Sequence, residues 1–276
     1  MSRIATTQIG ACQVTVLTDG ARSFPPQLFP GTTTETIDAL LSAAGETEIR
    51  TNFNAMLVRG PGPTVLVDAG GRDLMGDVAG HLPAALAEAG CSADAVQVLF
   101  VTHIHPDHIG GTVTADGAAA FANAELVLPE AELAFWSDPV RGENDATAEL
   151  YTLAQQMFAA YADRLRPLPD GGTIAPGLTA VPLPGHTPGH SGVRLESEGE
   201  TLVNVVDIVH AQHLQLSDPD IAIGFDADPE TARVTRKRML AEAAEAGFVV
   251  TGGHLLHPAL ARIEAAGTGY RLVPLD

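Results

Sequence analysis

The stretch from Thr102 to Gly111 reads Thr-His-Ile-His-Pro-Asp-His-Ile-Gly-Gly and follows directly on an apolar segment, residues 96–101. That segment has the length and composition of a buried β-strand. His103 and His105 stand two positions apart, so in an extended chain both imidazoles lie on one side and can bind one ion. Such a group of histidines beside a buried strand is costly unless a metal ion is bound.

Asp107 and His108 come directly after a proline, Pro106, which turns the chain so that both side chains can face a second ion. Gly110 and Gly111 leave room for a close backbone approach. Imidazole and carboxylate ligands of this kind suit zinc and other late first-row metals. The segment therefore predicts a metal site at a strand end.

Three further ligand-type residues each follow a predicted strand. His186 lies in a Pro-Gly-His-Thr-Pro-Gly-His run, Asp207 ends the apolar run of residues 202–206, and His254 follows residues 249–251. Strand ends that gather at one edge of a sheet are where α/β proteins build their sites. We therefore expect these three side chains to complete the metal site.

Apolar runs of strand length alternate in clusters with helical segments, which favours packed sheets with helices outside. A hairpin is expected around the Gly-Pro-Gly-Pro run at residues 60–63. Its strands are residues 54–59 and 64–68, and the other expected strands are 14–18, 96–101, 126–128, 178–183, 192–195, 201–206, 249–251 and 270–273. Helices are expected at 82–89, from about 129, at 146–162 and at 229–246. No linker interrupts the pattern, so residues 1–276 are expected to form one domain.

The chain carries 34 acidic and 15 basic residues, for a net charge of −19 at pH 7. This balance argues against nucleic acid as a partner, because binding phosphates requires basic patches. The densest basic run, residues 236–238, is expected on a solvated helix face. No membrane span or secretion signal is expected. Cys12 and Cys91 are too few for a disulfide framework, and a cytoplasmic location is expected.

The order His-x-His-x-Asp-His, followed by a histidine, an aspartate and a histidine, resembles the metallo-β-lactamase superfamily. The resemblance begins with the Leu-Val-Asp-Ala-Gly run at residues 66–70 and covers nearly the whole chain. Within the superfamily the chain looks most similar to the methyl parathion hydrolase group. The features that carry this similarity are residues 54–58, Phe135-Trp136, the His-Thr-Pro-Gly-His run of residues 186–190, and the tail at residues 267–274.

This resemblance implies an αββα sandwich with two divalent metal ions, zinc expected, at one edge. It implies one ion held by three histidines and a second held by two histidines and an aspartate, with another aspartate bridging both. By position, the first set is His103, His105 and His186, the second is Asp107, His108 and His254, and the bridge is Asp207. Asp68 matches a buried aspartate that orients ligands.

Two ions roughly 3.5 to 4 Å apart can share a hydroxide whose pKa falls toward neutrality, and that bridging hydroxide is the expected nucleophile. No serine or cysteine is needed, so the expected reaction is hydrolysis. Asp107 is in addition a candidate proton acceptor. The expected substrate is a small, neutral, partly apolar ester, lactone or phosphotriester, because no basic cluster awaits a phosphate monoester. The candidate pocket residues are Phe24, Phe29, Phe135, Trp136 and Phe225.

Two positions depart from the family pattern. Some lactonases of the family carry a tyrosine three residues beyond the bridging aspartate, where this chain has His210. His210 is a candidate hydrogen-bond donor to the substrate, and a plain loop role is the alternative. Val206 stands where relatives commonly carry a glycine.

Other functions share parts of this signature. Thioester hydrolysis of the glyoxalase II kind is the main alternative, but those enzymes carry a basic, helical glutathione-binding domain that we do not expect here. An iron-dependent oxidoreductase and a non-catalytic metal-binding protein are further alternatives. The resemblance also implies a homodimer.

Overall fold

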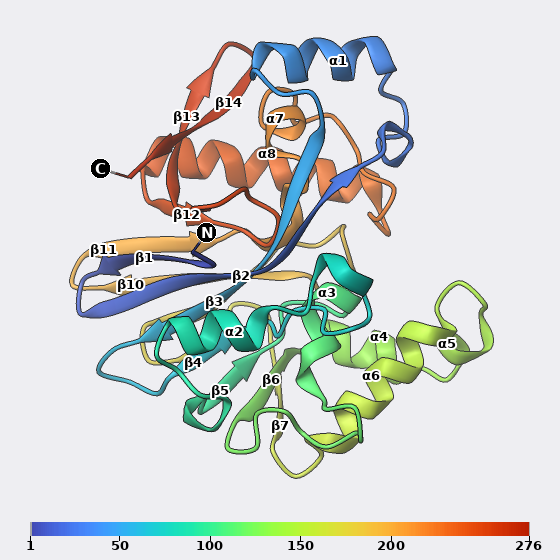
Figure 1. Cartoon of the computed structure of the whole chain (residues 1–276), viewed down its shortest axis with the longest axis vertical. Coiled ribbons are helices and arrows are strands. Elements are labelled where there is room, and N and C mark those ends of the chain that lie inside the picture. The colour runs from blue at the N-terminus through green and yellow to red at the C-terminus, as the bar shows by residue number, and fades with distance from the viewer. Residues whose placement is uncertain (1, 276) are drawn as a thin grey trace.

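Residues 2–275, described by a computed structural model, form two seven-stranded sheets that face each other, with helices on both outer sides (Figure 1). This arrangement confirms the expected αββα sandwich. The first sheet has the order β1 (Ile4–Ile9), β2 (Cys12–Phe24), β3 (Ile49–Arg59), β4 (Val65–Val67), β5 (Val98–Phe100), β6 (Glu125–Pro129) and β7 (Leu165–Leu168). The second runs from β14 (Gly269–Pro274) through β13 (Ala261–Ala266), β12 (Val249–Thr251), β11 (Glu200–Asn204), β10 (Ser191–Ser197) and β9 (Leu178–Pro182) to β8 (Thr173–Ala175).

Parallel neighbours within each sheet bring the carboxyl ends of key strands together. β3 and β4 form the expected antiparallel hairpin, with Met56 opposite Val67. β4 then pairs in parallel with β5, so that Val67 lies beside Phe100. β11 and β12 are likewise parallel in the second sheet. The segments that follow these strands therefore leave both sheets at one edge.

Side-chain alternation along the strands builds two hydrophobic layers. Val65 and Val67 of β4 point between the sheets, whereas Leu66 points toward the helices outside the first sheet. The same alternation places Phe100 between the sheets and Leu99 on the helix side. β4 and β5 are thus apolar on both faces, as the nearly continuous apolar runs in the sequence indicate.

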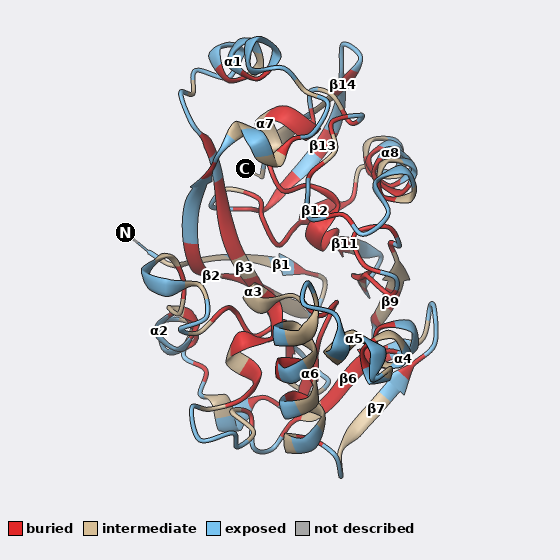
Figure 2. Ribbon diagram, turned by 90° about the vertical axis from the view of Figure 1, so that its right-hand side faces the viewer, coloured by how far each residue is buried: buried red, intermediate tan, exposed pale blue. Residues whose placement is uncertain are grey.

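Helices cover the two outer faces, and their inward sides are buried (Figure 2). α2, α4 and α6 pack on the first sheet, and α8 packs on the second. The cap of α8 follows the expected chemistry: the Asp228 carboxylate accepts the Thr231 N–H, and Gly247 ends the helix with a φ of 65°. The helices are α1 (Thr34–Ala43), α2 (Leu82–Glu88), α3 (Pro106–Ile109), α4 (Glu130–Ser137), α5 (Val140–Glu143), α6 (Ala148–Ala160), α7 (Gln212–Gln215) and α8 (Pro229–Ala246). Within residues 2–275 none of them is long and apolar enough to span a membrane.

Several elements were not expected from the sequence. β1, β7, β8 and β13 lie in polar or alanine-rich segments without a strong apolar period. α1 does carry a helical period, since Ile37 and Leu41 are both buried, but the helix was not predicted. The expectation that residues 236–238 lie on a solvated face is wrong for Arg236, which is fully buried. Its guanidinium donates to the carbonyls of Ile208, Pro219 and Ile221, and these bonds compensate its burial.

Candidate metal centre

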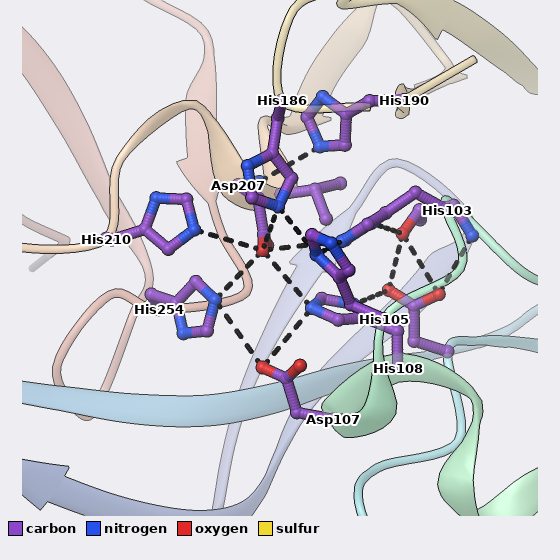
Figure 3. Close-up of polar contacts among 12 residues, drawn as sticks. His103, His105, Asp107, His108, His186, His190, Asp207, His210 and His254 are labelled. Carbon is purple, nitrogen blue, oxygen red and sulfur yellow. Dashed lines mark hydrogen bonds and ion pairs between the residues drawn. The ribbon is translucent and has the colours of Figure 1, made fainter. Parts of the chain in front are cut away.

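Histidines and aspartates from four chain segments meet where strands of both sheets end (Figure 3). The segment after β5 continues into the one-turn helix α3 and carries the first four of these residues. His186 lies between β9 and β10, Asp207 follows β11, and His254 follows β12. All seven residues expected as ligands thus converge at one edge.

One carboxylate oxygen, Oδ2 of Asp207, lies at the centre of this cluster. The Asp207 side chain is 2% exposed, so water does not compensate its charge. Five imidazole nitrogens surround the oxygen at 2.9 to 3.6 Å. They are Nε2 of His254 at 2.9 Å, Nε2 of His108, His186 and His210 at 3.3 Å each, and Nε2 of His103 at 3.6 Å.

The potential ligand atoms fall into groups whose members lie within 4.8 Å of one another. The first group is His103, His105, His186 and Asp207, and the second is Asp107, His108 and His254. These match the two ligand sets that the family resemblance implies. A third group joins His210, which was not predicted as a ligand, to Asp207 and His254.

Unpaired polar atoms show that these residues fit bound cations. Nε2 of His108 and Oδ1 of Asp207 are buried, yet neither has a hydrogen-bond partner among the described residues. Nδ1 of His105 lies 3.1 Å from Nε2 of His103 and 2.9 Å from Nε2 of His186. Lone pairs that converge in this way require either a shared proton or a cation between them. The donor set of imidazoles and carboxylates is one that zinc-type ions prefer.

Asp68, the residue after β4, holds one of the ligands from outside the cluster. Its Oδ2 accepts a hydrogen bond from Nδ1 of His108 at 2.8 Å. The backbone N–H of Thr102 donates to the same carboxylate at 2.9 Å, and the Thr102 hydroxyl also donates to it. Because Nδ1 of His108 is engaged, its Nε2 faces the cluster, which is how outer carboxylates commonly orient metal ligands.

Asp226 orients His186 in the way that Asp68 orients His108, and this role was not predicted from the sequence. Its Oδ1 lies 3.0 Å from Nδ1 of His186, and the buried guanidinium of Arg236 lies 3.6 Å from its other oxygen. An isolated aspartate in a loop gives no periodic signal. The only available hint is that outer carboxylates accompany ligand histidines in general.

Glu132 of α4 was missed as well, although it is fully buried. Its carboxylate accepts the backbone N–H of Ile104 at 3.0 Å and that of Gly189 at 2.8 Å. The Thr187 hydroxyl and the Trp136 indole also donate to it. Since Ile104 lies between two ligand histidines and Thr187 follows a third, Glu132 ties the two ligand loops together.

Burial and charge act in opposite directions within the cluster. Burial lowers the pKa of His103 well below its ordinary value, because it disfavours the protonated form. Burial also opposes protonation of His186, but hydrogen bonds to Asp207 and Asp226 raise its pKa to about 9. For Asp207, burial would raise the pKa, yet His108 and its neighbours hold it well below the usual range. The Asp207 carboxylate is therefore anionic, and a bound cation would compensate its charge.

His190 and Val206 fix the backbone of Asp207. The Asp207 N–H donates to Nε2 of His190 at 3.2 Å, while Nδ1 of His190 donates to the Leu183 carbonyl at 2.7 Å. This pattern requires a neutral ring, and burial lowers the pKa of His190 to about 3. Val206 adopts a φ of 48°, a conformation that favours glycine and costs on the order of 1–3 kcal/mol for other residues.

A cavity of about 240 Å³ opens onto the cluster. Two of the expected aromatic residues, Phe24 and Phe225, line it. Phe53 and Met75 also line it, and neither was expected from the sequence. The remaining lining residues are Arg22, Pro106, His210 and the ligands His105, Asp107, His186, Asp207 and His254.

Three expected pocket residues do not line this cavity, which corrects the sequence expectation. Phe29 is 1% exposed and packs in a separate core beneath α1 and α7. Trp136 is buried on the helix side of the first sheet, and Phe135 packs against the same core. Hydrophobic burial thus draws these aromatic side chains into the interior.

The sequence and the fold of this chain are both similar to those of known proteins. Residues 51–254 match a family described as the metallo-beta-lactamase superfamily. The hydrolase AbOPH, described as in the beta lactamase superfamily, is 29% identical over 100% of this chain and 98% of its own, with a TM-score of 0.93. The dizinc quorum-quenching lactonase AidC is 24% identical over 100% and 98%, with a TM-score of 0.91. A probable metal-dependent hydrolase from Staphylococcus aureus is 19% identical over 98% and 99%, with a TM-score of 0.81. No curated protein sequence matches the chain significantly.

Proposed function

Because this chain belongs to the metallo-β-lactamase superfamily, we propose that it is a dinuclear metal-dependent hydrolase. Its proposed substrates are small, partly apolar esters, lactones or phosphotriesters whose reacting group is uncharged. The observation that carries the proposal is the convergence of five imidazoles on Oδ2 of Asp207, where two buried ligand atoms lack a hydrogen-bond partner within residues 2–275.

The two proposed ions are bound by different sets of residues. We assign the first ion to His103, His105 and His186, and the second to Asp107, His108 and His254, with Asp207 between them. Zinc is the proposed metal. Ions bound there supply an activated water and polarise the carbonyl or phosphoryl oxygen of the substrate. Asp68, Asp226 and Glu132 keep the ligand side chains in place from outside.

Two residues of the cavity are proposed to act on the substrate. His210 lines the cavity, and burial lowers its pKa to about 4, so the ring is neutral at neutral pH. A neutral imidazole carries one N–H, which we assign as a hydrogen-bond donor to the substrate oxygen in place of the tyrosine of some lactonases. Asp107 also lines the cavity and is proposed to accept a proton at its carboxylate during turnover.

The walls of the cavity favour an apolar group on the substrate. Phe24, Phe53, Met75 and Phe225 line it, and an apolar pocket with a few convergent polar groups is typical of small-molecule sites. Similarity in fold to the lactonase AidC makes lactones the first class to assay. Aryl esters and phosphotriesters follow, because an activated water can attack carbon or phosphorus.

A turnover screen of the zinc-loaded enzyme tests this proposal. We expect a higher kcat/KM for neutral aryl esters or lactones than for phosphate monoesters, and detectable turnover of phosphotriesters. Phosphate monoesters that outpace neutral esters by a wide margin would contradict the substrate class. Preferential turnover of glutathione thioesters would favour the glyoxalase II alternative. Activity that depends on oxygen and iron would favour an oxidoreductase.

A further inference from the structure

Arg22 is the one basic residue among those that line the metal cavity. The chain has a net charge of −19, and ten of its 15 lysine and arginine side chains form ion pairs with nearby carboxylates. Within residues 2–275, Arg22 has no such ion pair. Its guanidinium carbon lies 5.8 Å from the ring centre of Phe24. In so acidic a protein, an arginine without a carboxylate partner at the mouth of a cavity is a feature that requires an explanation.

The strand register aims Arg22 at the cavity. β2 pairs with β3 so that Gly20 lies opposite Phe53 and Arg22 lies opposite Thr51. Because residues two apart share a face of a strand, Arg22, Phe24 and Phe53 stand on the same face of this ribbon. All three line the cavity. The position of Arg22 is therefore fixed by the sheet and not by a loop.

An aromatic pair stands beside the guanidinium. Phe24 and Phe225 meet edge to face, with ring centres 5.8 Å apart, and Phe225 also lies 6.1 Å from the ring of His210. Phe225 is 43% exposed, which is unusual for a large apolar side chain. A ligand that covers this ring would bury apolar surface and would place any polar end beside Arg22.

We propose that Arg22 is a specificity-determining residue that binds a carboxylate on the part of the substrate remote from the reacting ester. The aromatic pair takes the apolar or aryl group that carries this carboxylate. The inference rests on the proposed hydrolase function and narrows its substrate class. The reacting group stays uncharged, but the whole molecule is an anion. Arginine suits this role because its planar guanidinium matches a carboxylate with two parallel hydrogen bonds.

Two esters of similar shape, one anionic and one neutral, test the proposal: 4-acetoxybenzoate and 4-acetoxybenzamide. For the zinc-loaded wild type we expect the benzoate to have the lower KM. Arg22→Gln should lower kcat/KM for the benzoate about 10-fold, mainly through KM, the scale of one charge-assisted hydrogen bond. The benzamide should change by less than about twofold, and Arg22→Lys should recover part of the loss.

Arg271→Gln is the matched control, because it removes the same charge from an exposed position on β14. It should leave both esters unchanged. If Arg22→Gln left the benzoate-to-benzamide ratio at the wild-type value, or if Arg271→Gln lowered it equally, the subsite assignment would be wrong while the hydrolase function stood.

Product binding separates this inference from the proposed function. Calorimetry with 4-hydroxybenzoate and 4-hydroxybenzamide should show weaker binding of the benzoate alone in Arg22→Gln. This readout does not depend on turnover, so it tests the inference even if the proposed function fails because no ester, lactone or phosphotriester is hydrolysed. Equal benzoate affinity in the wild type and Arg22→Gln would overturn the inference.

Discussion

Nε2 of His254 lies 2.9 Å from Oδ2 of Asp207, so that side chains following the parallel strands β11 and β12 meet at one oxygen. The same oxygen is within 3.3 Å of Nε2 of His186, which belongs to the other proposed ligand set. Asp207 thus stands between the two sets. A carboxylate in this position can serve both ions, whereas each histidine serves only one.

Asp207→Ala should therefore reduce activity more than any single ligand histidine replaced by alanine. Both ions lose a ligand together, and we expect metal content to fall from two ions toward none. His254→Ala should keep the first ion. Metal analysis of the purified variants, together with kcat on an aryl ester, checks this. Near-normal metal content and rate in Asp207→Ala would exclude a bridging role.

His210→Phe should lower kcat/KM for lactones roughly 10-fold to 100-fold, the loss of one or two hydrogen bonds to the substrate. The substitution keeps a ring of similar size while removing the N–H. His213→Phe is the control, because His213 lies outside the cavity. Unchanged lactone kinetics in His210→Phe, with two ions still bound, would leave His210 with a structural role only.

Glu132→Gln should weaken binding of the first ion by about 10-fold to 100-fold, the usual effect of losing an outer ligand partner. An amide keeps the shape but offers one acceptor fewer, so the loop of His103 or that of His186 loses a contact. Glu130→Gln on the exposed side of the same helix is the control. Cobalt titration followed by absorption spectra reports the first site directly. Wild-type affinity for both ions in Glu132→Gln would show that the contact is dispensable.

The neutral ring of His190 predicts a specific acid sensitivity. Its pKa is about 3 in the fold and 6.5 when unperturbed, so below pH 6.5 the unfolded chain takes up a proton that the folded chain does not. Stability from this residue is complete above pH 6.5 and is lost as pH falls toward 3, by up to about 1.4 kcal/mol per pH unit. Urea unfolding of the metal-free wild type and His190→Gln should show their difference shrinking over that range. A difference independent of pH would contradict the depressed pKa.

The part of the site that repeats a local pattern was predictable from the sequence. The segment carrying His103 to His108 joins a buried strand to closely spaced ligands, and His186, Asp207 and His254 each follow an apolar strand. Their convergence depends on strand order, which the resemblance to a known family supplied. The burial of β4 and β5 on both faces was also predictable, because both strands are short apolar runs in the sequence.

The residues that were missed act through contacts between segments distant in the sequence. In the sequence, Glu132 cannot be distinguished from the other acidic residues of its helix. Its contacts to Ile104 and Gly189 form only when the fold brings their loops beside it. Asp226 and Arg236 likewise acquire their roles through burial together. The prediction for the aromatic residues was wrong for the opposite reason. Trp136 and Phe29 are residue types that often line pockets, but here both are buried in the cores of the two outer layers.

Zinc titration of the metal-free chain, with aryl ester hydrolysis recorded at each addition, tests the dinuclear assignment most directly. We expect tight binding of two zinc ions per chain and a rate that reaches its maximum only when the second ion is bound. Saturation at one ion, or full activity after the first equivalent, would contradict the account in which His103, His105 and His186 hold one ion and Asp107, His108 and His254 hold another.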